Sequence, residues 1–275
     1  MDLEHIKEPL ENQVRLLAIG DIIGRPGRQW IKKNLSSLRQ KLKVDLCIAN
    51  IENASGGFGI TEDSYKELLD AGIDAMTSGN HHYDQRGEKT WMDHADRMVR
   101  PLNFAPGGPG QTELRLSGHL ELPICLLNVM GRTFMKPYDC PFRALEPHFD
   151  QAGKTNFYLL DVHAETTSEK MALGFWVAGR FSAVWGTHTH VPTADARILD
   201  EYTGYLTDLG MTGPYDSVIG MRKESVLQSF LTLEKARFEV ASGDVRLGGC
   251  VYDLDRQTGQ CTFVKPLWLS EQDFN

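Results

Sequence analysis

Short apolar runs alternate with helical patterns through the first half of the chain. Three of these runs are predicted strands: Val14–Ile19, Val44–Ile51 and Ile73–Thr77. An amphipathic stretch around Gln29–Lys41 predicts a helix between the first two strands. Thr61 is a suitable N-cap for a second helix, which would lie between the second and third strands. This βαβαβ order predicts that the three strands pair in parallel.

The rest of the chain is richer in strand-like runs. The predicted elements are strands at Glu113–Leu116, Ile124–Val129, Phe157–Val162, Ala183–Trp185, Arg237–Ala241, Val245–Tyr252 and Cys261–Pro266, and a helix at Ser168–Gly179. The last three strands follow one another without an intervening helix, which favours antiparallel pairing. We therefore expect an α/β fold in which two packed mixed β-sheets are flanked by helices.

The length of the chain suits one domain with a substantial core. Of its 275 residues, we assign 14–275 to that domain and expect the mostly polar residues 1–13 to form a frayed tail. This tail lacks the apolar core of a signal peptide. No run approaches the ~20 apolar residues that a membrane span needs. The sequence therefore predicts a cytoplasmic protein that does not insert into a membrane.

Charge and cysteine content exclude several classes of function. The formal net charge of −8 argues against an extended nucleic-acid-binding surface. A small anionic substrate could still be attracted if bound metal ions reversed the charge locally. The five cysteines are odd in number and form no C-x-x-C pair, which argues against a disulfide framework or a thiolate zinc site. We expect Cys47 and Cys125, which lie in apolar runs, to be buried free thiols.

Residue types that bind metal ions follow most of the predicted strands directly. They are Asp21, Glu52, Asn53, Asn80, His81, His163, His188 and His190. Loops after the strands of an open α/β sheet lie along one edge, where such folds place their sites. Considered without the other residues, Asp21 could cap the next helix and His163 could be a core histidine. The glycines near Asp21 fit neither common nucleotide-binding loop, and Arg25 and Arg28 could either contact phosphate or start a solvated helix.

The order of these residues suits a two-metal hydrolytic centre. Oxygen and imidazole donors without thiolate favour iron, manganese or zinc. Glu52 could bridge two cations, and Asn53 could join it only if the chain curls after the strand. An extended segment would project His188 and His190 to one side. The two positive ions would generate a hydroxide and hold a phosphate for in-line displacement. His81 would then protonate the leaving oxygen as a general acid.

The motif order resembles that of the calcineurin-like metallophosphoesterases, and more closely that of their YmdB-like branch. The similar stretches are GDIIGRPGR (20–28), ANIENASGGFGIT (49–61), SGNHHYDQ (78–85), DVHAETTSEK (161–170), GTHTHVPTAD (186–195) and TDLGMTGPYDSVIGM (207–221). The resemblance implies the calcineurin-like α/β/β/α sandwich. It also implies a dinuclear centre of iron or manganese, and hydrolysis of small cyclic phosphodiesters such as 2′,3′-cyclic AMP.

The resemblance also implies a role for each candidate residue. One metal ion would be held by Asp21, Glu52, Asn53 and His190, and the other by the bridging Glu52 with Asn80, His163 and His188. His81 would be the proton donor. Ile23 stands where the wider superfamily has a histidine, and Asn53 would compensate for that missing imidazole. The branch more often has a small polar residue at His82, and neither His82 nor the 207–221 segment has an evident chemical role.

Other functions remain as alternatives. Phosphomonoesters or phosphoproteins are the second class of substrate, because no feature of the sequence separates monoesters from diesters. A metal-bound sensor with little turnover is the alternative outside enzymes. The metal-dependent amidohydrolases are disfavoured, because their His-x-His pair comes early in the chain whereas here it comes last. The sequence fixes neither the native metal nor the physiological substrate, and it is compatible with a homo-oligomer.

Overall fold

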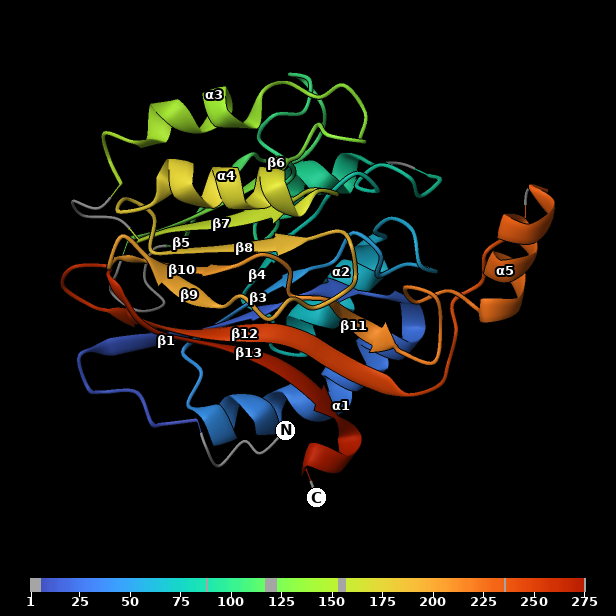
Figure 1. The fold of residues 1–275 in the computed structure, drawn as a ribbon, viewed down its shortest axis with the longest axis horizontal. Coiled ribbons are helices and arrows are strands. Elements are labelled where there is room, and N and C mark those ends of the chain that lie inside the picture. Colours follow the sequence, from blue (N-terminus) through green and yellow to red (C-terminus); the bar gives the residue numbers. More distant parts are fainter. Residues whose placement is uncertain (1–5, 88, 117–122, 153–156, 235, 275) are drawn as a thin grey trace.

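The computed structural model describes residues 6–87, 89–116, 123–152, 157–234 and 236–274 (Figure 1). The strands are β1 (Gln13–Ile19), β2 (Asp21–Ile22), β3 (Leu46–Asn50), β4 (Ala75–Thr77), β5 (Glu113–Leu116), β6 (Ile124–Met130), β7 (Phe157–His163), β8 (Ala183–Thr187), β9 (Arg197–Leu199), β10 (Thr203–Leu206), β11 (Met211–Pro214), β12 (Val245–Asp255) and β13 (Cys261–Ser270). The α-helices are α1 (Gly24–Leu42), α2 (Glu62–Asp70), α3 (Pro141–Leu145), α4 (Thr167–Val177) and α5 (Lys223–Thr232). Short 3₁₀ turns lie at Thr90–His94, Glu146–His148 and Glu271–Phe274.

The strands form two mixed sheets. The first has the order β2-β11-β12-β1-β3-β4, with β13 paired to β12. Strands β1, β3 and β4 pair in parallel, as the βαβαβ order predicts, whereas β12 is antiparallel to both β1 and β13. The second sheet has the order β5-β6-β7-β8-β10-β9, in which the inner strands β6, β7, β8 and β10 are parallel and the two edges antiparallel.

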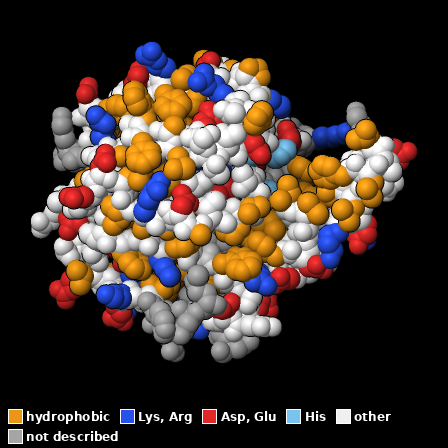
Figure 2. All heavy atoms as spheres, viewed as in Figure 1, with side chains coloured by type: hydrophobic (Ala, Val, Ile, Leu, Met, Phe, Trp, Pro, Cys, Tyr) orange, Lys and Arg blue, Asp and Glu red, His pale blue; other side chains and the backbone are white. Residues whose placement is uncertain are grey.

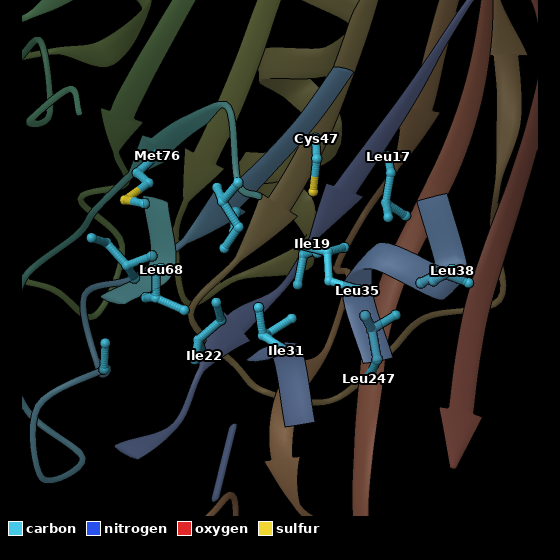
Figure 3. Close-up of a cluster of buried hydrophobic side chains, with 14 of the residues drawn as sticks. Leu17, Ile19, Ile22, Ile31, Leu35, Leu38, Cys47, Leu68, Met76 and Leu247 are labelled. Carbon is cyan, nitrogen blue, oxygen red and sulfur yellow. The ribbon is translucent and has the colours of Figure 1, made fainter. Parts of the chain in front are cut away.

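Alternation of side chains along β1 builds two of the three core layers. Leu17 and Ile19 face α1, where they pack with helix residues such as Leu35 (Figure 3). Leu16 and Ala18 point the other way and pack against the second sheet. A third cluster joins the far side of the second sheet to α4. The prediction of two mixed sheets between helices is therefore confirmed, and the four layers are visible in Figure 1.

The start of α2 is stabilised as the sequence predicts. The backbone N–H of Ser64 donates to the Thr61 hydroxyl at 3.3 Å, and the Thr61 N–H donates to the Ser64 hydroxyl at 3.1 Å. This reciprocal pair is a capping box, which satisfies donors that the first turn of a helix leaves free. Glu62 and Asp63 add favourable charge to the same turn. The segment 51–61, which carries two candidate ligands, is thereby fixed at its far end.

Two parts of the C-terminal third differ from the prediction. The strand expected at Arg237–Ala241 is wrong: the described residues there form only an isolated bridge between Val240 and Met221. A strand needs a neighbour to complete its ladder of hydrogen bonds, and the short Val218–Met221 turn offers one pairing position. The sequence analysis also missed α5, although Val226, Leu227 and Phe230 have helical spacing.

The structure describes part of the predicted N-terminal tail and the two cysteines that were predicted to be buried. Residues 1–5 of the predicted tail lie outside the described residues, while Ile6 belongs to the core and the Lys7 carbonyl accepts a hydrogen bond from Arg15. Cys47 and Cys125 are buried, as predicted. Within the described part of the chain, no helix combines the length and the hydropathy that crossing a membrane would require.

Candidate metal centre

The predicted ligands meet where strands of both sheets end. Asp21 begins the short β2, and Glu52 and Asn53 follow β3 in a turn. Asn80 lies in the turn after β4, and His163 is the last residue of β7. His188 and His190 come directly after β8. The structure thus brings all seven predicted ligands to one place, because carboxyl ends of neighbouring strands share an edge.

Three of these side chains surround His163, which is fully buried. Its Nε2 lies 3.0 Å from Glu52 Oε1, 3.0 Å from Asn80 Oδ1 and 3.1 Å from His188 Nδ1. Ligand atoms of Glu52, His163 and His188 all lie within 4.8 Å of one another. Two imidazoles, a carboxylate and an amide oxygen at this spacing form a donor set that could hold one divalent cation.

The other predicted ligands gather around His190. Its Nε2 lies 3.2 Å from Asn53 Nδ2 and 3.8 Å from Asp21 Oδ1. Asn53 also contacts Glu52 Oε1 at 3.3 Å, which joins this group to the one around His163. Glu52 therefore lies between two sets of ligands and contacts members of both. Asp21 Oδ1 is buried and accepts no hydrogen bond from any described residue, which suits a cation ligand.

The local backbone confirms one geometric expectation and overturns another. Strand β3 ends at Asn50, and the following turn brings Glu52 and Asn53 to one site, as the proposed curl requires. The prediction that the His188–His190 segment is extended is wrong. Strand β8 ends at Thr187, and both histidines adopt positive φ, 96° for His188 and 64° for His190. The left-handed turns, not strand alternation, bring the two rings to the centre.

Outer hydrogen bonds hold the three imidazoles so that one nitrogen of each faces inward. The Thr187 hydroxyl donates to Asp161 Oδ1 at 2.7 Å, so it accepts from His163 Nδ1–H at 2.9 Å. His190 Nδ1–H donates to the Ile219 carbonyl at 2.8 Å. His188 Nε2 lies 3.1 Å from the Glu165 carboxylate. Such outer partners fix the tautomer of a metal-binding histidine and make it a stronger ligand.

We expect Thr187→Val to weaken metal binding about 10- to 100-fold, the usual effect of removing an outer partner of a histidine ligand. The change keeps the shape of the side chain but leaves His163 Nδ1–H without its acceptor. Calorimetric titration of the metal-free variant measures the affinity. Thr187→Ser, which restores the hydroxyl, should bind metal as the wild type does. Equal affinity in Thr187→Val would show that the link to Asp161 does not position His163.

Gly79 leaves the space that the ligands around His163 occupy. A Cβ at this position would lie closer than 3.0 Å to both His163 Nε2 and Glu52 Oε2. Because these two side chains are buried, they cannot move away freely. We expect Gly79→Ala to lower metal affinity at least tenfold in the same titration, since one ligand must leave its position. Gly179→Ala is the control: its Cβ meets no atom within 4 Å, and although the φ of +73° makes the change mildly destabilising, metal affinity should stay unchanged.

The electrostatic setting favours a cation between the ligands. Burial raises the pKa of Asp21, and the negative charge of Glu52 adds to this effect, while the nearby histidines oppose it. Burial also lowers the pKa of His188 to about 3, so its ring is neutral near pH 7 and has a free lone pair. The negative charges of Glu52, Asp21 and Asp161 act the other way on His163, and its pKa rises to about 9 although burial opposes this. Buried carboxylates that share one site are an environment in which a divalent ion compensates charge.

His81 lies at the rim of the centre. Its backbone N–H donates to Glu52 Oε2 at 2.8 Å, which ties the loop to the proposed bridge. Its ring is about one quarter exposed, and Nδ1 contacts Asp84 Oδ2 at 2.6 Å. The edge of Phe58 packs against the ring at 5.0 Å between centroids. Asp84 and Phe58 thus orient the imidazole and leave Nε2 for contact with a ligand.

Three other residues that the sequence analysis considered have separate surroundings. His82 is fully buried and packs against the Tyr83 ring at 4.5 Å, and no described residue hydrogen-bonds to either of its nitrogens. Arg28 pairs with Glu67 at 2.7 Å and donates to the Ala54 carbonyl, so it supports the fold. Arg25 is exposed near the start of α1.

Several residues that position the ligands were not identified from the sequence. Glu165, Thr187 and Ile219 contact the three histidines, and Asp161 accepts a hydrogen bond from Thr187. All four residues lie in the stretches that carry the family resemblance. The 207–221 segment now has a role, because β11 pairs in parallel with β2 and places Met211 beside Asp21. Their presence in the shared motifs was the available signal, but no spacing rule links them to the ligands.

Comparison with known proteins identifies relatives of this chain. Residues 17–267 match the family model described as YmdB-like protein. The 2′,3′-cyclic-nucleotide 2′-phosphodiesterase of Bacillus subtilis is 43% identical over 94% of this chain and 98% of its own length. A crystal structure from Thermus thermophilus, titled as a hypothetical protein, has a TM-score of 0.87 and 41% identity over 94% of this chain and all of that one.

A second crystal structure, of a novel phosphatase from Mycoplasma pneumoniae, also has a TM-score of 0.87. It is 32% identical to this chain, and the match covers 96% of this chain and 97% of that one. Both structural matches therefore extend over nearly the whole chain. The chain belongs to the YmdB-like protein family.

Proposed function

We propose that this chain is a metal-dependent phosphodiesterase that hydrolyses small cyclic phosphodiesters such as 2′,3′-cyclic AMP. The observation that carries the proposal is the pair of ligand sets that share Glu52. The activity for which the Bacillus subtilis relative is named supports the substrate class. Family membership makes the chain a hydrolase, and it suits the calcineurin-like sandwich as the type of fold. We further assign residues 14–275 to one domain and the protein to the cytoplasm.

The donor set fits two divalent ions. Asp21, Glu52, Asn53 and His190 would hold one, and Glu52, Asn80, His163 and His188 the other. Oxygen and imidazole donors suit iron or manganese, and zinc also accepts them. When bound, such a pair of ions supplies Lewis acidity toward the phosphate and makes a water more acidic.

The protein's own groups would then direct the cleavage of the ester. His81 Nε2 would give its proton to the ribose O2′ as the P–O2′ bond breaks, while the water oxygen bonds to phosphorus. The product would be the nucleoside 3′-phosphate, in keeping with the 2′-phosphodiesterase name of the relative. Asp84 would hold the ring in place for the transfer through its 2.6 Å contact with Nδ1.

The test is turnover of 2′,3′-cyclic AMP by protein loaded with manganese or iron, with p-nitrophenyl phosphate in parallel and a chelated sample as control. We expect metal-dependent release of 3′-AMP. Activity on the monoester alone would replace the proposal with a phosphomonoesterase or phosphoprotein phosphatase. Metal-replete protein without turnover of either compound would favour the metal-bound sensor.

A further inference from the structure

A buried ion pair lies beside the turn formed by residues 188–190, which we call the histidine turn. Lys170 Nζ lies 2.5 Å from Asp208 Oδ2, and each of the two side chains is 1% exposed. On the face shown in Figure 2, other lysine and arginine side chains lie at the surface, where water solvates their charge. Neither Lys170 nor Asp208 is a predicted ligand. Because the cost of desolvation offsets the attraction between two buried charges, stability alone does not account for this pair.

Asp208 holds the middle of the histidine turn. The Thr189 hydroxyl donates to Asp208 Oδ2 at 2.8 Å, and the Thr189 N–H donates to the same oxygen at 3.4 Å. The residues on either side, His188 and His190, both have positive φ. A residue with a Cβ is strained in that conformation, which persists only where the surroundings hold it. The contacts of Asp208 with Thr189 provide such a hold between the two proposed ligands.

The same carboxylate is also tied to the strand beside Asp21. Asp208 Oδ1 accepts a hydrogen bond from the Gly210 N–H at 2.8 Å, and Met211, the next residue, pairs with Asp21 in the ladder of β11 and β2. The first N–H of the histidine turn donates to Asp21 Oδ2 at 3.1 Å. Asp208 therefore joins two segments that carry proposed ligands and fixes them relative to each other.

Lys170 reaches Asp208 from the start of α4, through a space that Gly186 leaves open. A Cβ at Gly186 would lie 2.7 Å from Lys170 Cδ, which is closer than such atoms approach. The ammonium at the end of this stem compensates the charge of Asp208. An uncompensated carboxylate beside the buried Asp21 and Glu52 would be costly, because like charges that are out of water repel strongly. Lys170 thus allows a carboxylate to support the histidine turn at this depth.

We propose that Lys170 and Asp208 are positioning residues of the metal centre: their ion pair holds the histidine turn in the place where its two imidazoles serve as ligands. The inference rests on the proposed two-metal centre. Both residues would act through Thr189, without contact to a metal ion or the substrate. The histidine turn supplies one proposed ligand to each ion, so a loosened turn should weaken the binding of both. Loss of the Thr187 hydroxyl, by contrast, acts on His163 and therefore on one ion.

The first experiment titrates metal-free wild type, Thr189→Val and Thr189→Ser with Mn²⁺ in a calorimeter. Thr189→Val keeps the shape of the side chain but removes its hydrogen bond to Asp208. We expect the affinity for both ions to fall about 10- to 100-fold, the usual effect of losing a partner outside the ligands, and Thr189→Ser to bind as the wild type does. A wild type without manganese binding would refute the centre itself. Two ions bound by the wild type, with equal affinity in Thr189→Val, would overturn the positioning role alone.

Lys170→Met tests the ion pair, because it keeps a stem of similar length and removes the charge. We expect the affinity for both manganese ions to fall at least about tenfold, and the unfolding temperature of the metal-free protein to fall as well, since Asp208 is left without its partner. Lys33→Met breaks an exposed ion pair with Glu271 and should change neither quantity. A purely structural pair would lower the unfolding temperature and leave the affinity of the folded protein unchanged, which would overturn the proposal. Thr189→Val decides the question if Lys170→Met is poorly folded.

Discussion

Glu52→Ala is expected to lose both metal ions, and with them all measurable turnover. The Glu52 carboxylate contacts His163 at 3.0 Å and Asn53 at 3.3 Å, so it belongs to both sets of ligands. Its loss removes one ligand from each ion and leaves Asp21 as the remaining carboxylate of the predicted set. Removing a ligand from an oxygen–imidazole site weakens binding far more than removing an outer partner, which itself costs 10- to 100-fold. Elemental analysis of the purified variant measures the metal content per chain.

A matched variant separates the bridge from an ordinary ligand. Asp21 contacts the group around His190, and no described contact joins it to the ligand atoms around His163 other than the backbone N–H of His188. Asp21→Asn should therefore keep the ion held around His163 and lose the other. Two ions per chain in Glu52→Ala would refute the bridging role. One ion in both variants would reduce Glu52 to a ligand of a single metal.

His81→Ala is expected to retain both ions but to lose about 10²–10⁴ in kcat, which is the usual contribution of a general acid. The ring sits at the rim, and its contacts are to Asp84 and Phe58, so its loss leaves the ligands in place. Measurement of kcat on 2′,3′-cyclic AMP, with metal content determined on the same sample, separates the two effects.

The choice of substrate sharpens this test. A diester with a nitrophenolate leaving group needs little protonation, so His81→Ala should impair its hydrolysis much less than that of the cyclic nucleotide. Asp84→Asn should lie between the wild type and His81→Ala, because Asp84 acts only through the ring. An equal loss on both substrates would point to a binding role for His81, and an unchanged kcat would remove it from catalysis.

The sequence predicted the position of the centre better than its internal geometry. The ends of strands can be predicted from a sequence, because apolar runs stop at polar residues. Parallel pairing then places those ends together. That reasoning predicted the residues from Asp21 to His190 that the structure brings to one place. The residues that hydrogen-bond to the predicted ligands could not be identified from the sequence. Contacts such as that of His190 with the Ile219 carbonyl join residues 29 positions apart, and no periodic pattern indicates them.

The same distinction explains the errors in the fold. Strands β12 and β13 were found because each carries a long apolar run that pairs along its length. Arg237–Ala241 has a similar local pattern but no partner strand, and strand formation depends on pairing as well as on composition. The exposed face of α5 could not be anticipated either, since an apolar helical pattern ordinarily indicates burial within the chain.

The left-handed turns at His188 and His190 have a consequence for how this protein can change over time. A residue with a Cβ at positive φ is strained by about 1–3 kcal/mol, and both positions carry histidine, with φ of 96° and 64°. Glycine at either position would relieve that strain while removing a proposed ligand. Selection for thermostability alone would therefore favour variants that lack these histidines. A library of variants must be screened for activity as well as for stability if the proposed centre is to be kept.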